Sequence, residues 1–202
     1  MPEKPRNHLY ETVQAKARAV FIALDERDSS TYAHSTRVAG LSQALGRACN
    51  LSAQELSLLL IAAGFHDIGK IGIPDSVLKK TTPLTEADWV VMKAHSEKSQ
   101  RILLAADVEG GETVGLAVRH HHERYDGFGY PDGLAGETIP FLARIVSVVD
   151  GYDAMGSARV CGPIRPHAEI MKILEDGKGR QHDPYFVDKL GAFIETSPLK
   201  FS

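Results

Sequence analysis

Histidines and carboxylates recur in short clusters along this chain, and these residue types bind divalent cations. His66 and Asp67 directly follow the apolar run LLLIAAGF, so we expect them at the inner end of a buried helix. A buried imidazole or carboxylate needs a partner or a metal, because burying an unpaired polar group is costly. The two carboxylate oxygens let Asp67 bridge two cations. Lys70, three residues further on, can then reach a phosphate held by those cations.

A second cluster, His121-His122-Glu123, stands directly before a glycine-rich stretch at 126–133. Adjacent residues on a helix point about 100° apart, so both rings can reach one ion only near a helix end. The glycine-rich stretch predicts such an end. His120 extends the run to three rings, which cannot all face one site, and we interpret His120 as a surface histidine.

Three further donors are scattered along the chain. His34 and His95 lie on predicted helices, and Asp150 follows an apolar run at 145–149. A lone histidine on a helix is usually structural, but donors from several helices together are typical of a site in the core of a bundle. Imidazole with carboxylate suits iron, manganese or zinc, and the lack of cysteine ligands argues against a structural zinc site. The candidate metal ligands are His34, His66, Asp67, His95, His121, His122 and Asp150.

The elements that must position these donors are helices. Apolar spacings of three and four predict helices over 9–24, 32–48, 53–65, Thr85 to Leu104, Thr113 to His122, 140–149, 166–174 and 184–194. Ser52 with Glu55, and Thr85 with Asp88, are typical of capping boxes that open two of these helices. No stretch alternates apolar and polar residues for long, so the predicted fold class is an all-α bundle. Residues 69–82 and 123–140 are predicted to be long irregular connections. We expect residues 1–28 to form an N-terminal amphipathic helical extension and residues 29–202 to form the domain itself.

Composition excludes several classes of protein. Apolar residues make up 43% of the chain and charged residues 24%, which is ordinary for a soluble domain. A net charge of -3 gives no reason to expect long nucleic acid or an anionic membrane as a partner. Cys49 and Cys161 are too few for a disulfide scaffold and fit a reducing cytoplasm. The apolar run from Leu56 to Phe65 is too short to span a bilayer, which needs about 20 residues.

Two long strings carry a family resemblance. The first runs His66-Asp-Ile-Gly-Lys-Ile-Gly-Ile-Pro-Asp75, and the second runs His121-His-Glu-Arg-x-Asp-Gly-x-Gly-Tyr-Pro131. With Asp150 and the segment Asp153-Ala-Met155, they resemble the HD-GYP family over roughly residues 28–193. The resemblance implies an HD-type helical bundle. It also implies a cytoplasmic bacterial phosphodiesterase that linearises cyclic dinucleotides, chiefly cyclic di-GMP, to pGpG and sometimes on to GMP.

Carried over residue by residue, the resemblance implies a binuclear centre of iron or manganese. One ion takes His34, His66, Asp67 and Asp150, and the second takes Asp67 as a bridge with His95, His121 and His122. Asp67 and Lys70 are then the catalytic residues, with Lys70 steadying the phosphate. Some members hold a third ion through a glutamate four residues before the first histidine. This chain has Ser30 at that position, which predicts two ions.

The stretch that grips the nucleotide departs from the family pattern. Arg159 is kept, but Gly162 replaces a second arginine, so affinity or base preference is expected to differ. Lys70, Tyr130 and Arg159 are the predicted substrate contacts.

Two alternatives stay open. One is a catalytically weak module that binds metal and cyclic di-GMP or cyclic GMP-AMP and signals through contacts, as a homodimer or with a diguanylate cyclase. The other is an HD hydrolase that acts on another phosphorylated substrate. The segments His121-His122-Glu123 and Gly129-Tyr130-Pro131 argue against this alternative.

Overall fold

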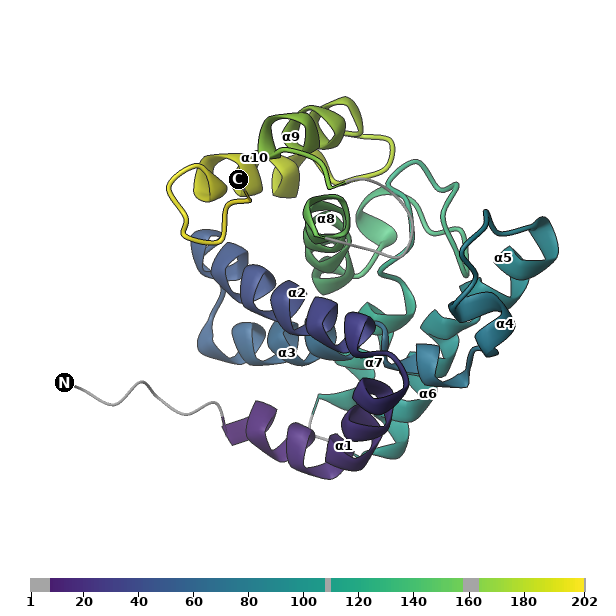
Figure 1. Ribbon diagram of the computed structural model, residues 1–202. Helices are drawn as coiled ribbons and strands as arrows, with labels where there is room; N and C mark the ends of the chain where they lie inside the picture. Colours follow the sequence, from purple (N-terminus) through teal and green to yellow (C-terminus); the bar gives the residue numbers. More distant parts are fainter. Residues whose placement is uncertain (1–7, 108–109, 158–163, 202) are drawn as a thin grey trace.

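The computed structural model describes residues 8–107, 110–157 and 164–201, which fold as a bundle of helices (Figure 1). The predicted all-α class is confirmed: within these ranges the only β-type pairing is an isolated bridge between Lys178 and His182. The helices are α1 (His8–Arg27), α2 (Ser29–Ala48), α3 (Ala53–Phe65), η1 (Ile68–Gly72), α4 (Asp75–Leu78), α5 (Glu86–Lys93), α6 (His95–Ala105), α7 (Gly111–Arg119), η2 (Gly136–Thr138), α8 (Phe141–Gly156), α9 (His167–Asp176) and α10 (Pro184–Ile194).

Side-chain caps fix where several of these helices begin. Asp28 accepts hydrogen bonds from the backbone N–H groups of Ser30 and Thr31 and so opens α2. Ser52 opens α3 and Thr85 opens α5, each through a reciprocal capping box with the acidic residue three positions later. The helix starts predicted at these two capping boxes are confirmed.

Helix α8 stands near the middle of the bundle, where it contacts α2, α3, α7, α9 and α10 (Figure 1). Apolar side chains cover most of its surface, which is typical of a buried helix. Ile145, Val148, Val149 and Tyr152 are all fully buried. Polar residues on α8 are therefore carried into the interior of the protein.

The end of α1 is attached to the bundle rather than projecting from it. Leu24 is buried in the common core. The Arg27 guanidinium pairs with Asp75 at the start of α4 and also donates to the carbonyl of Ile73. These contacts fix the segment that follows His66 and Asp67. In the described part of the chain, no helix has both the length and the apolar composition needed to cross a bilayer.

Two predicted helices end earlier than their apolar periodicity indicates. The single helix expected from Thr85 to Leu104 is wrong: α5 ends at Lys93, and α6 begins at His95. The helix expected to reach His122 ends at Arg119. In each case a histidine ring takes a carbonyl near the break, at Met92 and at Val118 respectively. Ring-to-carbonyl bonds of this kind compete with continued helix, and apolar spacing does not reveal them.

Gly69 allows η1 to lie directly against the start of α6. A Cβ added at Gly69 would lie 2.1 Å from the backbone oxygen of His95 and 2.5 Å from the backbone nitrogen of Ser99. The Gly69 N–H donates to the Ser99 hydroxyl over 2.7 Å. Only glycine permits this approach, which brings His95 next to Asp67.

Replacing Gly69 with alanine is expected to lower the free energy of unfolding by about 3 kcal/mol, because the new methyl group meets backbone that cannot move aside. Gly40→Ala is the matched control: apart from the neighbouring backbone of its own helix, no described atom lies within 4 Å of a Cβ added at this glycine. That change should stabilise by about 0.5–1 kcal/mol. Urea unfolding of both variants measures the difference. Equal stability in both would contradict the close packing of η1 on α6.

His182 is a buried histidine outside the candidate ligand set. Its ring lies 3.4 Å from the position a Cβ would take at Gly151 on α8, and Nδ1 has no hydrogen-bond partner among the described residues. Burial lowers the pKa of His182 to about 4, although Asp150 opposes the shift. The folded state therefore keeps this ring neutral where the unfolded chain, with a pKa of about 6.5, binds a proton.

Stability should fall as the pH drops from about 6.5 to about 4, because the unfolded state then holds the extra proton. His182→Phe removes this contribution. Between pH 7 and pH 5 the metal-free parent should lose up to about 2 kcal/mol more than the phenylalanine variant. Urea unfolding of both proteins at the two pH values measures this. An identical loss in both would show that His182 does not titrate as proposed.

Candidate metal centre

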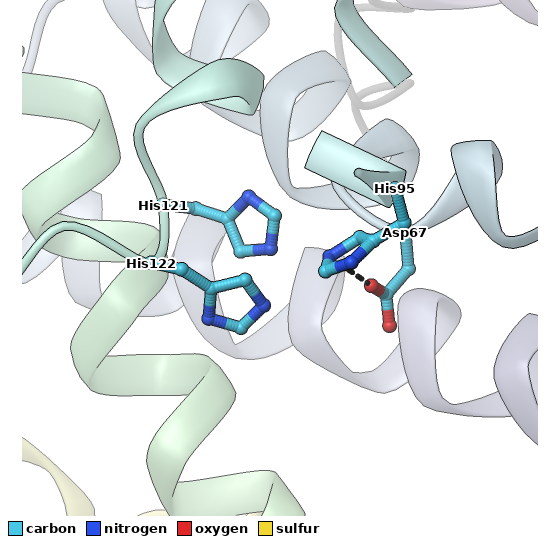
Figure 2. Close-up of side chains that lie close together, drawn as sticks. All are labelled: Asp67, His95, His121 and His122. Atoms are coloured by element: carbon cyan, nitrogen blue, oxygen red, sulfur yellow. Dashed lines mark ion pairs between the residues drawn. The ribbon is translucent and has the colours of Figure 1, made fainter. Parts of the chain in front are cut away.

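Two adjacent groups of donor atoms lie inside the bundle. One consists of His34, His66 and Asp150, and the other of Asp67, His95, His121 and His122. Within each group the donor atoms lie within 4.8 Å of one another. Figure 2 shows the rings of His121 and His122 one above the other on one side, facing His95 and Asp67 on the other. The structure thus brings together every predicted metal ligand, and these come from α2, from α8, from the first residue of α6 and from the turns after α3 and α7.

Asp67 lies between the two groups, and each of its oxygens faces a different one. Oδ1 is 3.3 Å from Nε2 of His95. Oδ2 is 3.4 Å from Nε2 of His66 and 3.8 Å from Nε2 of His34. This placement suits a carboxylate shared between two cations.

The charge on Asp67 is held in place by its neighbours. Burial alone would raise the pKa of its carboxyl, but the Lys70 ammonium and the His66 ring outweigh this effect and hold the pKa well below its usual range. Lys70 Nζ donates to Oδ2 of Asp67 over 2.6 Å, so the lysine points into the site. Asp67 is therefore ionised, as a metal ligand must be.

Three of the histidines lie just beyond helix ends and use the free carbonyls there. Nδ1 of His66 donates to Ala63 O, Nδ1 of His95 to Met92 O and Nδ1 of His121 to Val118 O, each over 2.7 Å. The last carbonyls of a helix have no intrahelical partner, so they are free to accept these bonds. A carbonyl can only accept, which places the proton on Nδ1. In the neutral rings the lone pair is therefore on Nε2, which faces the site.

His34 is placed differently, because it lies inside α2. Its Nε2 is 3.0 Å from Oδ1 of Asp150 and its Nδ1 is 2.6 Å from Oδ2 of Asp153. Burial lowers the pKa of His34, but the hydrogen bonds to these two carboxylates outweigh burial and raise it to about 9. Binding a cation at Nε2 therefore requires loss of the Nε2 proton.

His122 is oriented by stacking. Its ring centroid lies 3.9 Å from that of His121 and 4.9 Å from that of Tyr130, and the Tyr130 ring is inclined by 31° to it. The Lys93 ammonium lies over the Tyr130 ring, 5.2 Å from its centroid. The loop that carries Tyr130, within the second string, thus borders the donor groups.

The donor set fits a metal by its unsatisfied atoms. Oδ1 of Asp67, Nε2 of His95 and Nε2 of His121 are buried without a hydrogen-bond partner among the described residues. Leaving such atoms unpaired costs about 1–3 kcal/mol each. Burial also lowers the pKa of His95, of His121 and of His122, the last to about 3, so these rings are neutral and keep a free lone pair. Neutral imidazole with ionised carboxylate is a donor set for iron, manganese or zinc.

The interpretation of His120 as a surface histidine is wrong. His120 is buried; its Nδ1 bonds the carbonyl of Leu116 over 2.8 Å and its Nε2 bonds Asp132 over 2.8 Å. With Glu123 and Asp132 it forms a further cluster of potential ligands. Arg119, however, binds the same Asp132 carboxylate through two nitrogens, at 2.7 and 2.8 Å. That guanidinium supplies the cation which the carboxylate needs, so the cluster serves to hold the loop.

Arg159 and Gly162 fall outside the described residues. Ser30 is exposed, and its hydroxyl donates to Asp28 over 2.6 Å, so it acts at the helix cap.

Sequence reasoning placed Asp153 and Glu123 within motifs but assigned neither a role; both are buried carboxylates that support the site. Asp153 bonds His34, and Glu123 accepts the backbone N–H groups of Asp132 and Gly133 at 2.7 and 3.1 Å. The available signal for Asp153 was its place three residues after Asp150, on the same face of one helix.

A family model described as HD domain matches residues 19–185 of the chain. The chain belongs to the HD domain family. This HD domain is 40% identical over 180 residues to the cyclic di-GMP phosphodiesterase response regulator RpfG of Xanthomonas campestris, a match that covers 89% of this chain and 47% of that protein. It is 33% identical over 168 residues to 3'3'-cGAMP-specific phosphodiesterase 2 of Vibrio cholerae. That match covers 83% of this chain and 32% of that protein. The chain thus spans less than half the length of these curated relatives.

Solved structures share the fold of this HD domain. Bd1817, an HDG"Y"P protein from Bdellovibrio bacteriovorus, superposes with a TM-score of 0.67 at 23% identity, covering 83% of this chain and 53% of the other. The HD domain of the L. monocytogenes phosphodiesterase PgpH, solved in complex with cyclic-di-AMP, superposes with a TM-score of 0.60 at 19% identity. The superposition covers 86% of this chain and 94% of the other. The predicted HD-GYP resemblance is confirmed.

The histidine run permits a test of which rings bind metal. His121→Asn removes a donor whose Nε2 faces the site, whereas His120→Gln changes a ring that bonds Asp132. After loading with Mn²⁺ and removal of free metal, elemental analysis should find less metal in the His121 variant and the parent amount in the His120 variant. Loss of metal in the His120 variant would show that the wrong rings of the run were assigned.

Proposed function

We propose that this HD domain is a metal-dependent phosphodiesterase that hydrolyses cyclic dinucleotides, cyclic di-GMP first among them, to pGpG or GMP. The observation that carries the proposal is the pair of adjacent donor groups with Asp67 between them and Lys70 beside them. The names of the relatives, which act on cyclic di-GMP or 3'3'-cGAMP, support the substrate class. A cytoplasmic location belongs to the proposal, because cyclic dinucleotides are intracellular signals in the family that the motifs resemble.

Two divalent ions, iron or manganese, complete the proposed centre. His34, His66 and Asp150 would hold one and His95, His121 and His122 the other, with Asp67 shared between them. When bound, such a pair polarises a phosphate ester and makes a water molecule acidic enough to attack it near neutral pH. The protein's part is to present neutral imidazoles and ionised carboxylates at fixed positions, which the helix-end hydrogen bonds accomplish.

Lys70 and Tyr130 are the proposed substrate contacts in the described part of the chain, with Arg159 predicted beyond it. Lys70 would exchange its bond to Asp67 for one to a phosphate oxygen as the carboxylate becomes occupied. Burial raises the pKa of the Tyr130 hydroxyl, and the nearby Asp67 and Asp150 raise it further. Tyr130 therefore stays protonated and can donate a hydrogen bond to a phosphate or ribose oxygen.

The test is turnover by anaerobically purified protein loaded with Fe²⁺ or Mn²⁺. Cyclic di-GMP and cyclic GMP-AMP are supplied separately, and linear products and mononucleotides are separated by chromatography. We expect turnover of cyclic di-GMP, and we expect Asp67→Asn to lose at least about 100-fold in kcat, because the amide cannot serve as an anionic bridge. Asp176→Asn is the control: this carboxylate is exposed and pairs with Lys172 on α9, so the rate of this variant should match the parent.

Each outcome separates the alternatives. Bound metal and bound nucleotide without product would favour the module that signals through contacts, with a homodimer or a diguanylate cyclase as partner. Full activity in Asp67→Asn would refute the assignment of the bridge. Hydrolysis of other phosphate esters but of neither cyclic dinucleotide would favour a different HD hydrolase.

A further inference from the structure

His34 is the one proposed ligand histidine among the described residues that lies in the interior of a helix. It occupies the sixth position of α2 (Ser29–Ala48), where the carbonyls of the preceding turn already accept the helix's own N–H groups. The rings of His66, His95 and His121 are oriented by hydrogen bonds from Nδ1 to carbonyls at helix ends. His34 has no such carbonyl and needs an acceptor from another helix.

Asp153 supplies that acceptor from α8. Its side chain is fully buried, and Oδ2 lies 2.6 Å from Nδ1 of His34. A carboxylate in this place directs the proton to Nδ1 and leaves Nε2 to face Asp150 and His66.

Arg37 holds Asp153 in turn. Its Nε is 2.8 Å from Oδ1 and its Nη2 is 2.9 Å from Oδ2 of Asp153. The Ser157 hydroxyl lies 3.3 Å from Oδ2. Both oxygens are thus engaged by donors, so the carboxylate cannot rotate without breaking a bond. Arg37 also compensates the buried charge, which would otherwise be costly.

We propose that Asp153 is a positioning residue which fixes the tautomer of His34 and thereby sets the affinity of the His34, His66 and Asp150 group for its ion. The inference rests on the proposed metal centre and goes beyond it by distinguishing the two groups. The second group is oriented by neutral carbonyls and ring stacking, whereas the first depends on a charged acceptor. Removing that acceptor should therefore weaken one ion and spare the other.

Asp153→Asn is the informative change, because it keeps the shape of the side chain. Asparagine offers a single oxygen, and the Arg37 fork, which can only donate, competes for it. The neutral amide also lacks the negative charge that holds a proton on Nδ1 of His34, so a proton on Nε2, which blocks the ligand atom, becomes relatively more favourable. A carboxylate that orients a histidine in this way typically controls metal affinity by about 10–100-fold.

The experiment is a Mn²⁺ titration in which EPR counts the free ion. The parent should bind two ions. Asp153→Asn should bind one ion with parental affinity and the other about 10–100-fold more weakly. Asp183→Asn is the matched control, since Asp183 is also a buried carboxylate paired with an arginine, Arg144, but bonds no ligand histidine. It should bind both ions as the parent does.

Adding Asp153→Asn to two other single variants identifies which of the two ions it weakens. In His121→Asn, which retains the first group, adding Asp153→Asn should weaken the remaining ion. In His66→Asn, which retains the second group, the same addition should leave the remaining ion unchanged. The opposite pattern, or equal weakening in both, would overturn the inference.

A measurement on the parent covers the case in which Asp153→Asn does not fold. Proton NMR of the metal-free parent should show a strongly downfield imidazole N–H signal from the short His34–Asp153 bond, absent in His34→Gln. Its absence from the parent would overturn the inference. If the parent binds two ions and Asp153→Asn binds them equally well, only the role of Asp153 is refuted. If the parent binds none, the metal centre itself is refuted as well.

Discussion

The hydrogen bond from a histidine Nδ1 to a carbonyl at a helix end is the interaction on which the site depends. It occurs at His66, His95 and His121, with the acceptor three residues earlier in every case. A single contact thereby satisfies a carbonyl that the helix leaves free, stops the helix and fixes the ring. Because the carbonyl belongs to the backbone, the direction of each Nε2 is set by where the helix ends. The positions of these three imidazoles therefore depend on where α3, α5 and α7 end.

This arrangement explains why so many titratable groups can lie together in a buried place. Burial favours neutral imidazole, which lowers the pKa of His95, His121 and His122, while Asp67 and Asp150 stay ionised beside Lys70 and His34. In the absence of a cation, Lys70 and His34 balance the carboxylates. Each pairing uses the atoms that a metal would need. Metal binding therefore competes with internal ion pairs and with a proton on His34.

The sequence was most informative where structure depends on neighbours along the chain. Capping boxes at Ser52 and Thr85 predicted helix starts, and apolar periodicity predicted the bundle. The motifs named donors that the fold then brings together. Prediction failed where a residue distant in the sequence determines a helix end or the burial of a side chain. The break at Ala94 depends on a ring-to-carbonyl bond and on Gly69 of η1, and the burial of His120 depends on Asp132 across a loop. His34 and Asp153 are separated by 119 positions, so no local pattern reveals their contact.

Helix α8 links the core to the site. Asp150 and Asp153 lie three residues apart on it and approach opposite nitrogens of His34, Nε2 and Nδ1. Its remaining surface is packed by the apolar core, so the two carboxylates cannot shift along α2 without moving that core. The first donor group is consequently tied to the packing of the bundle, whereas the second is tied to the ends of α5 and α7 and to the loop that carries Tyr130. That loop is itself held by the bonds from Asp132 and Gly133 N–H to Glu123 and by the Arg119–Asp132 pair. Each donor group is therefore fixed by a different set of contacts.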